Sequence, residues 1–333
     1  MRPLAVTAKI IAVQPIPDAD RIHSVTVDCG AEGTWRGVTP KGFGIGDRVV
    51  VFLQDALLPE DDPRFTFLAS RKFRVSMRRF RGAPSECLIL ANDSGIPEIG
   101  VDVTELYRVR KYEKPLSESM SGEALGAFPT NRCPVTDEEH FQRVPEQVAR
   151  MTEEAHYATE KADGTSCTAW VEEDGLHVCS RNLELREFSL GNPEKSNLYW
   201  RMARKYGMER LPQGLFLQFE IVGPGVQKNP LRLKENEIRV FSGYEVRARR
   251  YLPYTALCRL CEELELPKAR LLWVRSPNQK NCTEQGNEST PTPEELLKTA
   301  EIEYAPGIPG EGIVIRALDS SWSFKVLNLL YKD

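Results

Sequence analysis

The segment Glu160–Ser166 contains the residue types needed to form a covalent bond to a nucleotide. Lys161 is followed by a small residue, an aspartate and a glycine, between two short segments typical of strands. A lysine held out of water near phosphates changes its pKa readily and can then act as a nucleophile. Asp163 can hold that lysine or a metal-bound water, and Gly164 allows close approach of a nucleotide. An ordinary Asp-Gly turn with a surface lysine is the alternative interpretation.

Further polar residues lie at the ends of, or inside, apolar segments that are typical of strands. Taken one at a time, each is explained by the ordinary polarity of a strand edge. Their order along the chain is more informative, because a lysine is followed by an Arg-Asn pair, two glutamates and a second lysine. These residues are Ser180, Arg181, Asn182, Glu220, Glu311 and Lys325.

In this order the residues resemble the motifs of the covalent nucleotidyltransferases, which comprise ATP-dependent DNA and RNA ligases and mRNA capping enzymes. Lys161–Gly164 matches the first motif, Glu220 the third, Glu311–Ile315 the fourth, and Lys325 the first lysine of the fifth. Phe241 matches the aromatic residue that stacks on the purine, and Tyr244 is a competitor for that role.

Two features resemble RNA ligases more than DNA ligases. Ser180–Asn182 looks like the RNA-ligase version of its motif, as does the run Ile221–Pro230. A barrel-like segment precedes the motifs and few residues follow Lys325, which is similar to the Deinococcus-type and Naegleria-type RNA ligases. The resemblance implies sealing of 3′-OH and 5′-phosphate ends at nicks whose 3′-OH strand is RNA. An ATP-dependent DNA ligase and a non-catalytic OB-fold RNA-binding protein remain alternatives.

The resemblance also implies a role for each residue in a reaction that passes through a lysyl-AMP and then an adenylylated 5′ end. ATP would be bound by Glu160, Lys161, Gly164, Arg181, Asn182, Phe241 and Lys325. Mg²⁺, or Mn²⁺, would be held mainly through water by Asp163, Glu220 and Glu311, since Mg²⁺ keeps several of its waters. The catalytic set is Lys161, Asp163, Glu220, Glu311 and Lys325.

One position departs from the family pattern. Many relatives carry a second lysine two positions after the first lysine of the fifth motif, and this chain has Leu327 there. Either Lys332 reaches the site instead, or Lys325 acts alone on the α-phosphate.

The chain of 333 residues carries a net charge of −4, which argues against indiscriminate binding to nucleic acid. A local patch can still bind, and residues 64–85 contain no acid. Arginines interleaved with Phe73 and Phe80 suit a surface that follows phosphates and stacks bases, although a solvated strand face is the usual alternative. The basic residues of this stretch are Arg71, Lys72, Arg74, Arg78, Arg79 and Arg81.

The pattern of elements predicts an α+β protein. Residues 1–105 contain five short strands, including Phe73–Phe80, and favour an OB-type β-barrel, with another small barrel as the alternative. Residues 106–126 are predicted to be a linker. Residues 127–333 are predicted to form an adenylyltransferase domain of antiparallel sheets flanked by helices. Thr136 or Asp137 is expected to cap a helix over Glu139–Gln142.

The remaining expectations concern the protein's surroundings. No apolar run approaches the roughly 20 residues of a membrane helix, and the N-terminus lacks a secretory pattern. We therefore expect a cytoplasmic monomer that acts on nicked or broken RNA, or on an RNA-containing duplex. Cys258 and Cys261 form a lone C-x-x-C that reads as helix packing rather than a zinc site.

Overall fold

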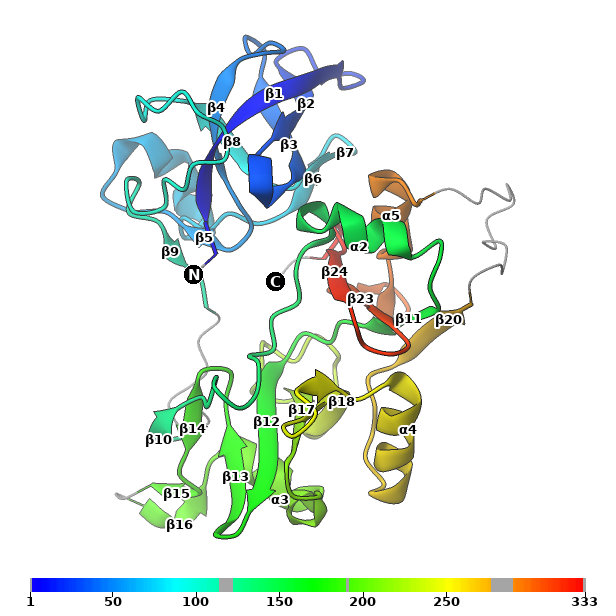
Figure 1. Ribbon diagram of the computed structural model, residues 1–333. Helices are drawn as coiled ribbons and strands as arrows, with labels where there is room; N and C mark the ends of the chain where they lie inside the picture. Colours follow the sequence, from blue (N-terminus) through cyan, green and yellow to red (C-terminus); the bar gives the residue numbers. More distant parts are fainter. Residues whose placement is uncertain (1, 114–121, 190–191, 277–289, 332–333) are drawn as a thin grey trace. The chain divides into compact units, whose positions relative to one another are not determined.

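The computed structural model describes residues 2–113, 122–189, 192–276 and 290–331. Contacts divide the chain into two units (Figure 1). The first comprises Met1–Lys114 with Phe141–Pro145, and the second comprises Pro115–His140 with Glu146–Asp333. The domain limits expected from the sequence stay a prediction. Among the described residues, no helix has the length and apolar character needed to cross a membrane.

The first unit is built on a five-stranded antiparallel sheet with the strand order β3-β2-β1-β4-β8. Its interior packs the ring of Phe52 edge-on against Phe65 and Tyr107, at centroid distances of 5.4 and 5.2 Å. The sheet strands are β1 (Ala5–Pro15), β2 (Ile22–Asp28), β3 (Thr34–Pro40), β4 (Arg48–Phe52) and β8 (Leu88–Ala91). The smaller elements are η1 (Gly30–Glu32), β5 (Ala56–Leu57), η2 (Pro63–Arg71), β6 (Arg78–Phe80), β7 (Ala83–Ser85), β9 (Arg110–Lys111) and η3 (Phe141–Arg143).

One strand of this sheet differs from the sequence prediction. Phe73–Phe80 does not form a strand of the five-stranded sheet, because Lys72 and Phe73 adopt left-handed backbone angles (φ 52° and 58°) that end η2. Within this range Arg78–Phe80 is strand β6, which pairs with β7 in a separate two-stranded sheet. The strand of the sheet that the sequence analysis did not predict is β3. Its buried positions include Gly37 and Thr39, which give little apolar signal. A Cβ at Gly37 would lie 2.4 Å from Ile89 Cδ1, so a larger residue there would have to displace the Ile89 side chain.

The second unit contains two antiparallel sheets, called here the large sheet and the small sheet. The large sheet has the order β10-β14-β13-β12-β17-β18-β19, and the small sheet has the order β20-β11-β23-β24. Helix α3 packs on β13, α4 on β18 and α5 on β24 (Figure 1). The expected α+β fold, with an OB-type sheet followed by antiparallel sheets and helices, is therefore confirmed.

The strands of the large sheet are β10 (Ala124–Ala127), β12 (Thr165–Glu172), β13 (Gly175–Cys179), β14 (Leu183–Leu185), β17 (Leu215–Val222), β18 (Glu237–Glu245) and β19 (Arg250–Tyr251). Those of the small sheet are β11 (His156–Glu160), β20 (Leu271–Arg275), β23 (Gly312–Ala317) and β24 (Ser323–Leu327). The helices are α2 (Pro145–Arg150), α3 (Leu198–Lys205), η4 (Met208–Arg210), α4 (Tyr254–Glu263) and α5 (Pro293–Thr299). Two hairpins complete the unit, β15 (Phe188–Ser189) with β16 (Asn192–Ser196) and β21 (Glu303–Ala305) with β22 (Ile308–Pro309).

The expected helix over Glu139–Gln142 does not form. Glu139 and His140 instead run beside β24, where the backbone N–H of Lys325 donates to the Glu139 carbonyl at 2.7 Å. Thr136 and Asp137 cap nothing, because their side chains contact groups on the two sheets. A short 3₁₀ turn, η3, follows at Phe141–Arg143. Tertiary contacts therefore outweigh the local capping signal.

Candidate active site

Lys161 lies where the chain passes from the small sheet to the large sheet. It follows β11 and precedes β12, and its backbone N–H donates to the Gly312 carbonyl at the start of β23. Three residues later the chain is pressed against the large sheet. A Cβ at Gly164 would lie 2.2 Å from the Ile221 carbonyl oxygen and 2.8 Å from Glu220 Cγ. Glycine at this position therefore permits close packing of protein on protein, whether or not a nucleotide also approaches it.

The Lys161 ammonium is paired with a carboxylate. Its Nζ lies 2.7 Å from Glu311 Oε2, and both side chains are largely shielded from solvent. Burial lowers the pKa of Lys161, but the Glu311 carboxylate, helped by Glu220 and Asp163, outweighs burial and raises that pKa above its ordinary value. The Glu311 carboxylate therefore favours the protonated form of Lys161, which is not nucleophilic.

Glu220 is the carboxyl group with the most unusual pKa in this cluster. Burial, followed by the neighbouring charges of Glu311 and Asp163, raises its pKa to about 8, although Lys161 and Arg181 oppose the rise. Placing several carboxylates close together costs free energy, and a nearby cation reduces that cost by offsetting their charge. Oxygen donors of this type suit Mg²⁺ or Mn²⁺.

The described residues contain one group of three metal-ligand side chains whose donor atoms lie within 4.8 Å of one another, namely Glu172, Asp174 and His177. The carboxylates around Lys161 do not form such a group.

Two basic residues that were expected to bind phosphate meet at a carboxylate. Arg181, just after β13, lies 2.9 Å from Asp137 Oδ2. Lys325, on β24, lies 3.8 Å from Asp137 Oδ1. The structure therefore brings Arg181 and Lys325 together across the two sheets. Asn182 is solvent-exposed.

Phe241 is placed by an irregularity in the large sheet. Phe219 pairs with Val240 and Gln218 with Ser242, which leaves Phe241 as the extra residue of a β-bulge. Bulges re-aim side chains next to functional sites. The buried guanidinium of Arg316 lies 5.7 Å from the Phe241 ring. The competitor Tyr244 packs against an apolar cluster that contains Trp170 and Phe216.

Glu160 is buried at the end of β11. Burial raises its pKa, while the Arg270 guanidinium, 2.8 Å from Oε2, opposes the rise. Leu327, which replaces the second lysine, pairs with Gly312 in the small sheet. Lys332 lies outside the described residues, so its contribution stays a prediction.

The sequence reasoning missed several residues that join the site. Asp137 was interpreted as a helix cap, and neighbouring Glu138 contacts Arg316 at 2.7 Å and also accepts a hydrogen bond from Ser323. Tyr304 and Tyr331 contact the Lys161–Asp163 segment through their hydroxyl groups. The acidic run Asp137–Glu139 was the one available signal for Asp137 and Glu138. The sequence gives no comparable signal for Tyr304 or Tyr331.

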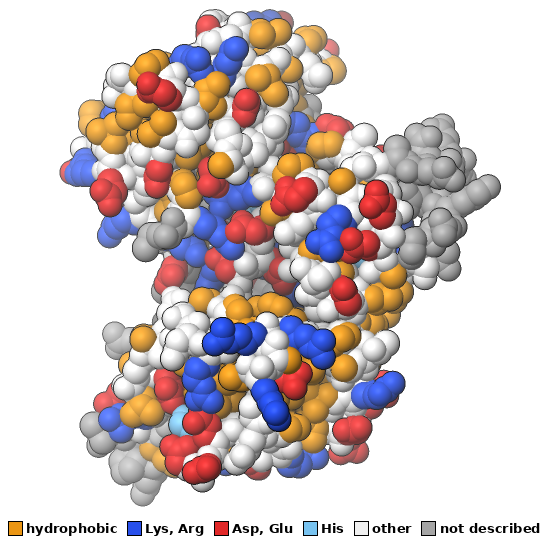
Figure 2. Space-filling view, in the orientation of Figure 1, with side chains coloured by type: hydrophobic (Ala, Val, Ile, Leu, Met, Phe, Trp, Pro, Cys, Tyr) orange, Lys and Arg blue, Asp and Glu red, His pale blue; other side chains and the backbone are white. Residues whose placement is uncertain are grey.

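The basic stretch of the first unit is partly engaged within that unit. Arg74 lies 3.0 Å from Asp55 and 4.1 Å from the centre of the Tyr112 ring. Arg78 and Arg79 are half-buried and donate to Ser76 and Gly82 respectively. The exposed members are Arg71, Lys72 and Arg81. Figure 2 shows basic and acidic side chains interspersed over the visible face.

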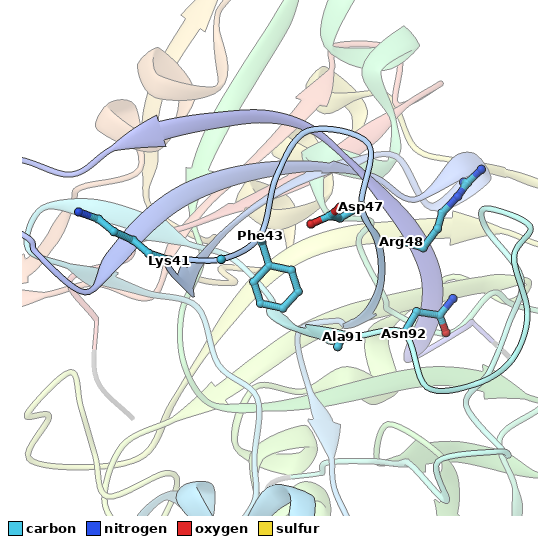
Figure 3. A pocket seen from close by; sticks show the side chains of 7 residues that line it. Lys41, Phe43, Asp47, Arg48, Ala91 and Asn92 are labelled. Carbon is cyan, nitrogen blue, oxygen red and sulfur yellow. The ribbon is translucent and has the colours of Figure 1, made fainter.

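The first unit also has a shallow pocket beside the loop between β3 and β4 (Figure 3). Its lining includes Phe43, Asp47 and Asn92, together with two basic residues. The side chains of those basic residues, Lys41 and Arg48, extend away from the Phe43 ring in Figure 3. The pocket is therefore not arranged to surround a phosphate.

Comparison with known proteins identifies the family. A family profile described as RNA ligase matches residues 154–331, which hold the site around Lys161, and an OB-fold domain profile matches residues 4–91. The chain belongs to the RNA ligase family.

Solved structures similar to this RNA ligase include those of Naegleria gruberi RNA ligase. The structure with pyrophosphate is 30% identical, has a TM-score of 0.82, and aligns over 99% of this chain and 98% of that one. A mutant with ATP and Mn is 29% identical with a TM-score of 0.80, over 99% and 97% of the two chains. Another mutant, with AMP and Mn, is 29% identical with a TM-score of 0.81, over 99% and 98%. A search of curated proteins found no match. The expected RNA ligase with an N-terminal OB-fold domain is confirmed.

Proposed function

We propose that this RNA ligase joins 3′-OH and 5′-phosphate ends with ATP through a lysyl-AMP on Lys161. The observation that carries the proposal is the Lys161–Glu311 pair in a cluster of carboxylates. The approach of Arg181 and Lys325 to the same carboxylate, that of Asp137, supports it. The Naegleria ligase structures with ATP, AMP and Mn support the same nucleotide and a divalent cation here.

The first step requires neutral Lys161. Its Nζ attacks the α-phosphorus of ATP, the bond to pyrophosphate breaks, and the nitrogen gives up a proton to the departing pyrophosphate as the phosphoramidate forms. Before this, the Lys161 ammonium must already have lost one proton. The Glu311 carboxylate holds that proton in place before the reaction. Mg²⁺ or Mn²⁺ bound by Asp163, Glu220 and Glu311 through water would supply positive charge that opposes the ammonium form of Lys161. These carboxylates thereby couple nucleophile activation to cation binding.

The other side chains would bind and orient the nucleotide. Phe241, the extra residue of the bulge, would stack on the adenine, and Glu160 would offer a buried carboxyl group to the base or ribose. Arg181 and Lys325 offset charge on the α-phosphate as it is attacked. The AMP then passes to the 5′-phosphate, and the RNA 3′-OH displaces it.

Nicked RNA, or an RNA-containing duplex with an RNA 3′-OH strand, is the proposed substrate. An OB-fold domain is a common support for single strands, and the exposed basic residues Arg71, Lys72 and Arg81 would contact its phosphates. The cytoplasmic location and the monomeric state stay predictions.

Labelling tests the first step. Wild-type protein incubated with α-labelled ATP and Mg²⁺ should retain label through denaturation, and Lys161→Ala should remove it. Lys298→Ala is the matched control, since Lys298 is 81% exposed and pairs with Glu301 at the surface. Equal labelling of the Lys161→Ala variant would show that another residue is the nucleophile. Sealing of nicks with ribose or deoxyribose 3′ ends then separates RNA from DNA ligation.

A further inference from the structure

The Tyr304 hydroxyl makes three backbone contacts inside the active site. It accepts a hydrogen bond from the Asp163 N–H at 2.9 Å and another from the Glu311 N–H at 3.1 Å. It donates to the Lys161 carbonyl at 2.8 Å. One oxygen atom thus joins the segment that carries the nucleophile to the residue paired with it.

The position of Tyr304 in the fold explains this geometry. It lies on β21, which pairs with β22 in the hairpin that leads into Glu311. A Cβ at Gly310 would lie 3.3 Å from the Tyr304 ring, so the chain passes close over the ring just before Glu311. The ring also packs edge-on against Tyr331, with 6.2 Å between the ring centres, and the Tyr331 hydroxyl donates to the Asp163 carboxylate.

The three contacts satisfy two backbone donors and one backbone acceptor within the site. The Tyr304 side chain is half-buried, and a phenol, whose ordinary pKa is about 10, keeps its proton at neutral pH. It therefore serves as a permanent donor to Lys161 and a permanent acceptor for the other two groups. Covalent catalysis is sensitive to such placement, because a displacement of about 1 Å can cost about a hundredfold in rate.

We propose that Tyr304 is a positioning residue that sets the distance and angle between Lys161 and Glu311 for attack on the nucleotide. The inference rests on the proposed function, since it concerns the adenylylation of Lys161. Tyr304 touches backbone groups rather than the reacting atoms, so it acts through the residues it holds. Its effect should therefore be confined to the step in which Lys161 forms a bond.

A comparison of two steps tests the proposal in the full-length protein. Tyr304→Phe removes only the oxygen atom. We expect the single-turnover rate of labelling by α-labelled ATP to fall by about a hundredfold at saturation. The ATP concentration for half-maximal rate should stay within about threefold, since the nucleotide contacts are unchanged. Sealing of a nick that already carries AMP on its 5′-phosphate should also stay within about threefold, because Lys161 forms no bond in that step.

Tyr199→Phe is the matched control, because its buried hydroxyl also hydrogen-bonds in the second unit, to Thr165 Oγ1 at 2.8 Å. It should label at the wild-type rate. A Tyr304→Phe variant that labels within about threefold of wild type would overturn the positioning role. Equal losses in labelling and in sealing of the pre-adenylylated nick would also overturn it, because they would indicate a general folding defect. Failure of the wild-type protein to label would overturn the proposed function as well.

Discussion

Asp137 and Arg181 form an ion pair of 2.9 Å at the point where phosphate is expected to bind. The other oxygen of Asp137 faces Lys325 at 3.8 Å. A carboxylate of the protein thus occupies the space between two cations before any nucleotide arrives. If Arg181 and Lys325 bind phosphate as proposed, an incoming phosphate must compete with that carboxylate for both of them.

Removal of the Asp137 charge should strengthen anion binding. We expect Asp137→Asn to lower the inhibition constant of pyrophosphate in the labelling assay by up to about fivefold, the upper range of a partly exposed ion pair. Glu187→Gln is the control, since it alters a surface pair with Arg204 of the same 2.9 Å length. Weaker inhibition by pyrophosphate would show that Asp137 orients the two cations rather than competing for them.

Gly164→Ala should disturb both stability and activity. The added Cβ would meet the Ile221 carbonyl oxygen at 2.2 Å, which forces β12 and β17 apart near Glu220. Overpacking of this kind costs about 1–3 kcal/mol of unfolding free energy, measurable by denaturant titration. Gly126→Ala is the matched control, because a Cβ there meets nothing within 4 Å. Equal stability of the two variants would show that the strands separate easily.

His177 should stabilise the fold at low pH. Burial lowers its pKa, but hydrogen bonds to Glu184 and Asp174, at 2.7 and 2.9 Å, outweigh burial and raise that pKa above the ordinary 6.5. The folded state then binds the proton more tightly than the unfolded state. The stabilisation is complete below pH 6.5 and is lost as the pH rises through the raised folded value.

The measurement is the difference in unfolding free energy between wild type and His177→Gln, followed from about pH 5.5 to about pH 8.5. This difference in unfolding free energy should become smaller as the pH rises. His156→Gln should show the opposite slope, because burial lowers the pKa of His156 and the neutral form is the one favoured by folding. Parallel slopes for the two variants would contradict the assignment.

The basic stretch should separate into residues that bind RNA and a residue that supports the fold. Arg74→Ala breaks the pair with Asp55 and the contact with the Tyr112 ring, so it should lower stability by about 1–2 kcal/mol. Alanine at Arg71, Lys72 and Arg81 together should leave the melting temperature unchanged. That triple variant should bind nicks more weakly. The slope of its binding constant against salt concentration should fall by an amount that corresponds to up to about three released counterions, while labelling by ATP stays unchanged. Loss of labelling in the triple variant would indicate that these side chains serve the fold.

The residues proposed to take part in the reaction were easier to predict from the sequence than the residues that hold them in position. Lys161, Glu220, Glu311 and Lys325 were predicted because their order along the chain resembles the motifs of a known family, and the structure pairs Lys161 with Glu311 near Glu220. Tyr304 could not be found, because a tyrosine in a short strand carries no periodic signal and its hydroxyl bonds only to backbone. Such bonds depend on tertiary placement that no local pattern encodes.

The segment around Asp137 shows how a local signal can mislead. A Thr-Asp pair followed by glutamates is a capping pattern, yet the same side chains serve ion pairs and hydrogen bonds with residues 30 or more positions away. Strand β3 was missed for a related reason, since Gly37 and Thr39 fill buried positions where the pattern expects large apolar groups. Close packing, rather than hydrophobicity, selects these residues.

The passage of the chain from one sheet to the other has a mechanical consequence. The Lys161 backbone N–H is hydrogen-bonded to Gly312 of the small sheet, whereas Gly164 packs closely against Ile221 of the large sheet. If the two sheets spread to admit a nucleotide, the bend must fall between these anchors. Lys161 would then travel with Glu311 and Lys325, while Phe241 and Glu220 stay behind with the large sheet. Such a movement would therefore change the distance between Lys161 on one side and Phe241 and Glu220 on the other.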